Sequence, residues 1–331
     1  MHRTTVVILN SNHIMRLSSL QHAGVLFFAL VLLAAAGCEQ SFDPKGPYQK
    51  RLVVYSILTS RSDSQFVRIY TSYNPSGFDP LQVTTDTYIR NAQVKIADDS
   101  VECHLQGIVI PRSDKSRYTS DVFAYVGYPF PLRPNKSYTL TITSADGNAI
   151  ATAVMPGNGR VDANNPYILK APEKYDEPIS ARVWLSSVTL GYLLRLYLEF
   201  DASVGSGMVH VRTEVPQSII TNGDLGTQLV YPRMVRRIMD YSVVYEVVYF
   251  DLDAYKYFFD QLKAQYADMR LTSATYILTQ MEPNLYKYFN IANGFQDEFS
   301  IRTDLPDFSS IEGGFGVFGA MADDSVVVDL R

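Results

Sequence analysis

Short stretches with apolar residues at alternate positions dominate the sequence from residue 51 onward. Because successive side chains of a β-strand point to opposite faces of a sheet, this period of two predicts strands with one buried face. Seven such strands fall within about 105 residues, with no helical pattern between them, which is typical of an immunoglobulin-like sandwich. They are Arg51–Leu58, Phe66–Tyr70, Ala92–Ile96, Val101–Ile110, Tyr118–Tyr125, Tyr138–Thr143 and Ala149–Val154.

Turn residues divide this pattern from the rest of the chain. Asp146-Gly147 predicts a hairpin between the last two strands, because glycine accepts a positive φ. Pro156-Gly157-Asn158-Gly159 then interrupts the alternation, and an irregular stretch continues to Pro178. We therefore expect the sandwich to cover residues 50–156 and a second domain to cover residues 157–331.

The second domain is expected to be rich in β-structure and to carry two helices. Asp253–Met269 has an apolar stripe at helical spacing, with Asp251 or Asp253 available as N-cap. Pro283–Asn293 opens with a first-turn proline and is followed by Gly294, which predicts the second helix. The strands expected here are Leu194–Phe200, Met208–Val215, Tyr241–Phe250, Gly313–Ala320 and Val326–Leu330. The predicted fold class is therefore mainly β.

The N-terminal part has a different character, because Val25–Ala36 is an uncharged apolar run that stops at Gly37-Cys38. Twelve residues in a helix span roughly 18 Å, short of the roughly 30 Å bilayer core, so a signal peptide fits better than a transmembrane anchor. Three small residues followed by a cysteine suit the cleft of a signal peptidase and supply the thiol that accepts a diacylglycerol. We therefore predict a lipoprotein signal peptide at residues 1–37, lipidation of Cys38, and a spacer at residues 38–49.

Lipidation of Cys38 affects the rest of the prediction. Fatty acyl chains such as palmitate, two or more on one residue, are sufficient for stable membrane anchoring. Only Cys103 would then remain, so no intrachain disulfide can form, and a buried structural role is favoured over a reactive thiol. Met15-Arg16 would begin a signal of ordinary length, so the true start, Met1 or Met15, stays open.

The charge pattern argues against nucleic acid as a partner, since the net charge is −5 and no basic stripe is present. Gly314–Gly319 matches G-x-G-x-x-G as text, but it lacks the strand-turn-helix setting that a dinucleotide site needs; a glycine-spaced strand explains it better. His210, Arg212 and Glu214 share one strand face, either as a binding row or as a solvated surface.

The spacing of the candidate residues indicates neither a catalytic site nor a metal site. His104 and His210 are over a hundred positions apart, and Ser206 lacks the context of a nucleophile elbow. We therefore predict no catalytic residues, no metal and no cofactor, and a protein that is not an enzyme. The 23 tyrosines and one tryptophan also invite a glycan-binding interpretation, because sugars stack on aromatic faces, although tyrosine is simply favoured in strands as well.

Several segments resemble an uncharacterised lipoprotein family of the Bacteroidetes, catalogued as a domain of unknown function. They are Arg51–Leu58, Asn91–Asp98, Tyr138–Gly147, Tyr286–Phe289 and Ile311–Ala320, of which the last is the most specific. The family is often encoded beside TonB-dependent outer-membrane receptors, and it brings no catalytic residues. The resemblance implies an outer-membrane lipoprotein that is an accessory to nutrient uptake.

Taken together, these patterns predict a protein anchored in the outer membrane through Cys38, facing either the periplasm or the cell surface. It would act as a non-enzymatic binding or accessory subunit, with a TonB-dependent transporter as its expected partner. Two alternatives stay open. One is a glycan-binding surface module, and the other, less favoured, is an extracytoplasmic hydrolase.

Overall fold

The computed structural model describes residues 48–74, 84–116, 118–164, 166–205, 207–222, 226–238, 244–292 and 308–331. Its content, 53% strand against 12% helix, confirms the expected mainly β fold class. Cys38, the apolar run before it and Gly294 lie outside the described residues. None of the helices within these ranges has both the length and the hydropathy needed to cross a bilayer.

The first part of the chain forms a sandwich-like pair of sheets, as expected. One sheet contains β1 (Leu52–Thr59), β2 (Gln65–Thr71), β6 (Val122–Gly127) and β5 (Gln106–Ile110) in this order. The other contains β4 (Glu102–His104), β3 (Gln93–Ala97), β7 (Ser137–Ser144) and β8 (Gly147–Val154). Every second residue of β1 and β7 is buried in one shared core, which includes Leu52, Val54, Leu58, Tyr138, Leu140 and Ile142.

The expected single strand Val101–Ile110 is wrong, because the chain changes sheets at Leu105. Residues before Leu105 form β4, which pairs with β3, whereas residues after it form β5, which pairs with β6. Leu105 itself is buried in the core. The apolar alternation of Val101, Cys103 and Leu105 stops at Gln106-Gly107, and the apolar run Ile108–Ile110 then follows. The prediction joined these two patterns into one strand.

A second group of strands surrounds a second core. The larger sheet continues through β17 (Ala267–Met281), β11 (Gly191–Val204) and β12 (Gly207–Glu214), with β15 (Val235–Arg236) paired to β11. A smaller sheet contains β16 (Glu246–Phe250), β10 (Ile179–Trp184) and β9 (Arg160–Asn164), and β13 (Ser218–Asn222) pairs with β14 (Gly226–Val230). The short helices α2 (Pro166–Lys170) and η2 (Pro172–Lys174) follow β9.

The first predicted helix is shorter than expected, and its last residues belong to a strand. Helix α3 runs from Leu252 to Gln265, with Asp251 as its N-cap, so the expected end at Met269 is wrong. The chain leaves the helix at Tyr266, whose backbone is extended, and continues as the 15-residue strand β17, in which Asp268 has a φ of 51°. Helix α4 (Pro283–Ala292) confirms the second predicted helix, although its expected last residue, Asn293, lies outside the described part of the chain.

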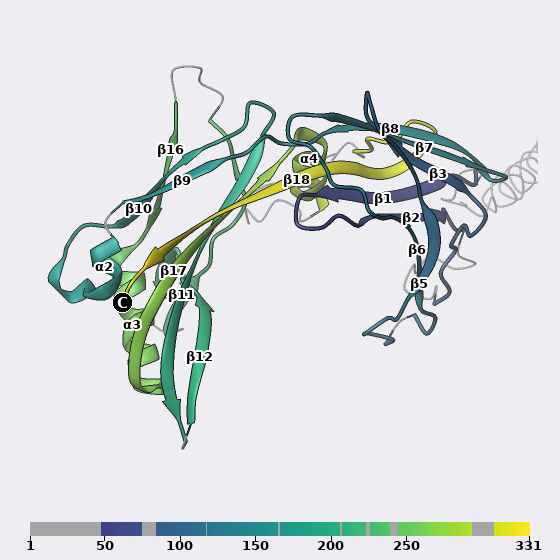
Figure 1. Cartoon of the computed structure of the whole chain (residues 1–331). Helices are drawn as coiled ribbons and strands as arrows, with labels where there is room; N and C mark the ends of the chain where they lie inside the picture. Colours follow the sequence, from purple (N-terminus) through teal and green to yellow (C-terminus); the bar gives the residue numbers. More distant parts are fainter. Residues whose placement is uncertain are drawn as a thin grey trace, which may run out of the picture. The chain divides into compact units, whose positions relative to one another are not determined.

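Strand β18 (Gly314–Asp329) joins the two groups of strands. Its first half pairs in parallel with β1, from Leu52↔Gly314 to Thr59↔Met321, and its second half pairs antiparallel with β17 (Figure 1). The two strands expected at the end of the sequence are therefore one continuous strand. Phe318 and Ala320 of β18 are buried in the core of the sandwich, whereas Val326 and Val328 pack against the second core.

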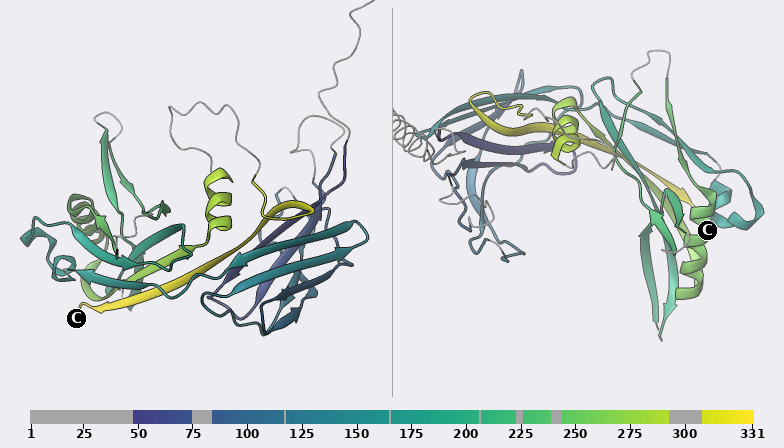
Figure 2. Two further views of the ribbon diagram at one scale, coloured as in Figure 1. Left: turned by 90° about the horizontal axis from the view of Figure 1, so that it is seen from above. Right: turned by 180° about the vertical axis from the view of Figure 1, so that it is seen from behind.

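The expected boundary at residue 156 stays a prediction. By its contacts, the chain from Lys50 to Arg331 is one compact unit, and residues after the boundary contribute to both cores. Helix α4 lies beside β18, as both views in Figure 2 show.

Candidate functional site

Tyrosines gather on the face of β1 and β2 that points away from the sandwich core. Leu52, Val54 and Ile69 point inward, so the intervening Tyr55 and Tyr70 lie on the opposite face. The Tyr55 and Tyr70 rings meet edge to face with their centroids 6.2 Å apart, and Tyr70 packs on Tyr88 at 4.9 Å. Such ring pairs hold one another in fixed orientations.

This face carries a hollow of about 470 Å³, which is within the size range of small-molecule sites. Val53 is the only apolar aliphatic side chain among the described residues that line it. The others are aromatic, hydroxyl-bearing or charged: Tyr55, Tyr70, Thr71, Ser72, Tyr73, Thr85, Asp86, Thr87, Arg112 and Tyr118. Tyr55 and Tyr73 are 39% and 42% exposed, so their rings are accessible to a ligand.

An ion pair between Arg112 and Asp86 supports the polar side of the hollow. Arg112 Nη2 lies 2.6 Å from Asp86 Oδ2, and the two side chains are only 20% and 8% exposed. The guanidinium also donates to the Tyr88 hydroxyl (3.0 Å) and to the Ser120 carbonyl (2.9 Å), and it lies over the Tyr118 ring. These contacts neutralise both charges within the protein and leave the pair with little freedom to move.

Tyr55 and the adjacent Tyr88 stay uncharged in the physiological pH range. Burial and the neighbouring Tyr288 hydroxyl raise the pKa of Tyr55 to about 12. Burial, together with Tyr70 and Asp86, raises the pKa of Tyr88 well above the usual tyrosine value. The phenols can therefore both donate and accept hydrogen bonds, and they add no negative charge to the hollow.

Helix α4 supports Tyr55 from the side, because the Tyr288 ring packs edge to face against it at 6.2 Å. The start of this helix is fixed by Glu282, a buried carboxylate. It accepts hydrogen bonds from the backbone amides of Asn284 (2.8 Å), Leu285 (2.8 Å) and Ala320 (3.3 Å). Burial raises the pKa of Glu282, although these three donors act against the increase. One side chain thus caps α4 and ties it to β18.

The glycine motif of the sequence explains why α4 and β1 can approach β18 so closely. A Cβ atom on Gly319 would lie 2.8 Å from Leu285 Cβ, so the bare backbone makes room for the helix. Gly316 has a φ of 112°, and a Cβ there would overlap the Val54 carbonyl oxygen of β1. The glycines serve strand packing, as expected from the sequence, and the segment has none of the strand-turn-helix geometry of a dinucleotide site.

The predicted polar row on β12 is part of an exposed set of cross-strand ion pairs. His210 Nδ1 lies 3.1 Å from Asp201 Oδ1, Arg212 Nε lies 3.4 Å from Glu199 Oε1, and Glu214 lies 3.7 Å from Arg195. His104 is elsewhere, on β4, and contacts Glu102. Neither histidine lines the tyrosine hollow. The two predicted histidines are therefore not brought together.

The remaining predicted residues have structural surroundings. Cys103 is half-buried beside the sandwich core, and burial raises the pKa of its thiol, which fits the structural role. Ser206 lies outside the described residues. Within the described ranges, no group of three His, Cys, Asp or Glu side chains is placed to hold a metal ion.

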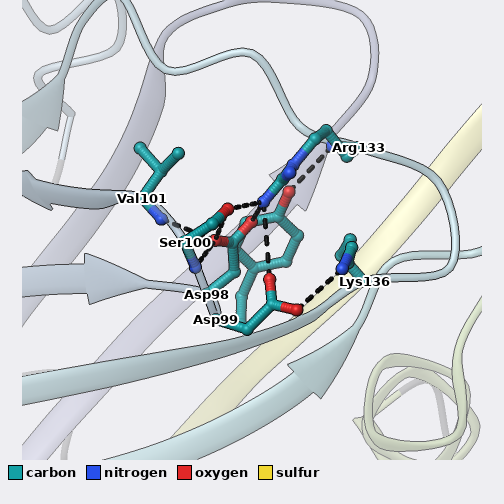
Figure 3. A network of polar contacts seen from close by, with 7 residues as sticks. Asp98, Asp99, Ser100, Val101, Arg133 and Lys136 are labelled. Atoms are coloured by element: carbon teal, nitrogen blue, oxygen red, sulfur yellow. Dashed lines mark hydrogen bonds and ion pairs between the residues drawn. The ribbon is translucent and has the colours of Figure 1, made fainter.

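A second polar network lies at the turn between β3 and β4 (Figure 3). Asp98 accepts hydrogen bonds from the Ser100 and Val101 amides, both 2.8 Å long, and it pairs with the Arg133 guanidinium. Burial would raise the pKa of Asp98, but these donors outweigh it and hold the pKa well below its usual range. Because the turn and Arg133 engage both carboxylate oxygens, we interpret this network as a structural tie rather than a ligand site.

No pattern in the sequence indicated Asp86 or Arg112 as site residues. They lie 26 positions apart outside the regular strands, so no periodicity or motif connects them. The alternation in β1 and β2 did place Tyr55 and Tyr70 on one sheet face, but nothing in the pattern showed that this face is hollow.

The chain is similar to a catalogued protein family. No curated protein matches the chain. A family model described as "Domain of unknown function (DUF4249)" matches residues 39–326, which include both cores, the tyrosine hollow and the glycine motif of β18. The chain therefore belongs to the DUF4249 family.

Proposed function

We propose that this protein is an outer-membrane lipoprotein of the Bacteroidetes that acts as a non-enzymatic binding or accessory subunit of a TonB-dependent transporter. The observation that carries the proposal is the end of the apolar run, where Ala35, Ala36 and Gly37 precede Cys38. This arrangement suits cleavage before the cysteine and acylation of its thiol. Acyl chains would hold the protein at a membrane surface, where a membrane transporter is within reach.

The tyrosine hollow supports the binding part of this proposal. Its lining is fixed by ring contacts and by the Asp86–Arg112 pair, so a ligand would meet a preformed surface. Preformed sites bind with a smaller loss of conformational entropy than sites that have to be ordered. A small nutrient held there could be passed to a transporter.

The alternative of a glycan-binding surface module is favoured by one observation, the exposed rings of Tyr55 and Tyr73 within the hollow. The two roles are compatible, because a binding subunit of a transporter has to recognise what is transported. The hydrolase alternative gains no support from the described residues, since His104 contacts the exposed Glu102, and His210 contacts Asp201 and Glu199 away from the tyrosine hollow.

Intact-mass and peptide analysis of protein purified from its native host would test the anchor. We expect a mature N-terminus at Cys38 with acyl groups attached, and recovery in the outer-membrane fraction. Cys38→Ala should abolish acylation and release the protein from the membrane, whereas the matched control Cys103→Ala should not. An unmodified thiol at Cys38 with residues 1–37 still attached would contradict the proposal.

Affinity purification in mild detergent would test the partner. We expect a TonB-dependent transporter to be recovered with the tagged wild-type protein and with Cys103→Ala. Recovery of the lipidated protein without any membrane partner would argue against the accessory role while leaving the anchor intact.

A further inference from the structure

We propose that the tyrosine hollow binds a neutral saccharide, with one sugar ring stacked on Tyr73 and Tyr55 and its hydroxyls bonded around Asp86 and Arg112. This inference rests on the proposed binding function and adds the ligand class and the residues that recognise it. The aromatic surface, the charges and the hydroxyl groups of the hollow support this assignment.

The aromatic surface supplies the apolar contact that a sugar needs. A sugar ring has one or two faces made of C–H groups, and these faces pack favourably on the electron-rich face of an aromatic ring. Tyr55 and Tyr73 keep 39% and 42% of their surface exposed although they line a hollow. Tyr70 lies between Tyr55 and Tyr88, so the aromatic surface is continuous and held from behind.

The charges of the hollow favour a neutral ligand over an ion. Among the described residues, its lining contains one acidic and one basic side chain, Asp86 and Arg112, and these two are paired with each other at 2.6 Å. An anion placed at Arg112 would approach the Asp86 carboxylate, and a cation placed at Asp86 would approach the guanidinium. Tyr55, which lines the hollow, stays uncharged and adds no negative charge beside this pair.

The hydroxyl groups match a ligand that is itself rich in hydroxyls. Thr71, Ser72, Thr85 and Thr87 line the hollow beside the ion pair. Thr87 Oγ1 donates to the Thr71 carbonyl (2.7 Å), which orients its oxygen and leaves it able to accept a further hydrogen bond. Short hydroxyl side chains and a paired carboxylate and guanidinium can together donate and accept, as each sugar hydroxyl does.

Binding would be tested with the full mature chain, purified in detergent, by titration calorimetry against neutral gluco-, galacto-, manno- and xylo-oligosaccharides. Sodium phosphate and glucuronate serve as anionic probes. We expect saturable binding of at least one neutral oligosaccharide, with no competition from either anion. Failure of all four neutral series to bind at 10 mM, or displacement by phosphate, would overturn the proposal.

Variants at Tyr73 identify the site. Tyr73→Ala removes the exposed ring and should weaken binding about tenfold, whereas Tyr73→Phe keeps the stacking face and should stay within about threefold. The matched control is Tyr257→Ala, a tyrosine of similar exposure (38%) on α3, outside the hollow. Equal weakening by Tyr257→Ala and Tyr73→Ala would overturn the assignment, as would unchanged binding in Tyr73→Ala.

The sugar-binding experiments test the ligand class separately from the proposed accessory role. A lipidated Cys38 and a recovered transporter, combined with no sugar binding, would refute only the ligand class. Sugar binding by a protein that is neither acylated nor associated with a transporter would keep the site and refute the accessory role.

Discussion

Strand β18 passes through two regions that are built in different ways. Its first half lies between β1 and α4, where Gly316 and Gly319 let backbone and helix approach closely and the buried Glu282 bonds three amides. Its second half borders β17, in the sheet whose face carries the charges of β11 and β12. There, Glu199 lies directly across from the oppositely charged Arg212, and Asp201 lies across from His210, which is charged only when protonated.

This difference predicts which substitutions the protein tolerates. In the first region a single added carbon overlaps the neighbouring backbone, and the buried Glu282 carboxylate accepts from three amides, so its removal leaves those amides unsatisfied. In the second region the polar groups are exposed, and water replaces any partner that is lost. We therefore expect substitutions of similar size to have very different effects in the two regions.

The largest effect is expected from Gly316→Ala, compared with Gly205→Ala at the tip of the β11–β12 hairpin. Both glycines have positive φ, but a Cβ on Gly316 would overlap the Val54 carbonyl, whereas nothing lies within 4 Å of one on Gly205. Urea unfolding should show a loss of about 4 kcal/mol or more for Gly316→Ala, or no folded protein at all. Gly205→Ala should lose only about 1 kcal/mol. Equal losses would contradict the close approach of β18 to β1.

The next largest effect is expected from Glu282→Gln, which removes one of the acceptor oxygens that cap α4. The free energy of unfolding should fall by about 2 kcal/mol at neutral pH, because a backbone amide loses its partner in a buried site. The folded-state pKa of Glu282 is raised, so wild-type stability should rise as the pH falls through this pKa towards the usual value of glutamate. Denaturant titrations at several pH values should show that the variant lacks this rise.

Asp98→Asn tests a carboxylate of the same sandwich whose contribution to stability depends on pH in the opposite direction to that of Glu282. The folded-state pKa of Asp98 is lowered, so its stabilising contribution is present above the ordinary aspartate pKa and is lost as the pH falls through the folded-state value. At neutral pH the variant should lose about 1–2 kcal/mol, because its bond to Arg133 is no longer charge-assisted. Thermal unfolding from pH 7 to pH 2 should make the two proteins converge. A constant difference between them would contradict the role of the Asp98 charge.

The smallest effect is expected from Arg212→Ala in the exposed row of β12. The pair with Glu199 is 3.4 Å long and open to solvent, so the loss should be about 0.5 kcal/mol and should shrink further in 1 M salt. Unfolding curves at low and high salt would measure it. A loss as large as that of Asp98→Asn would show that the two regions do not differ as described.

The sequence was sufficient for features that depend on local periodicity. Alternation predicted β1, β2, β7 and β8 well, and capping residues predicted where α3 and α4 begin. Features that depend on a turn without a glycine or proline were missed. Tyr266 and Met269 continue the helical spacing of α3, so the first residues of β17, Ala267–Met269, were taken for part of the helix, and the change to extended backbone at Tyr266 had no recognisable signal.

The candidate site was only half predictable for a similar reason. Tyr55 and Tyr70 follow from the alternation of the strands, whereas the Asp86–Arg112 pair brings together two irregular segments through tertiary contacts. A sheet face looks the same in the sequence whether it is flat or hollowed by the loops around it. The ligand class therefore had to be inferred from the structure.

The central place of β18 has a consequence for how the chain reaches its native state. Arg61, just after β1, pairs with Asp323 of β18, 262 positions further along the chain. Contacts this distant in sequence form slowly, because a long loop has to close first. Neither core is complete before β18 arrives, and until then the edge of β1 is a template for association with other chains. The time taken to place one strand therefore sets how long the newly made protein is exposed to aggregation.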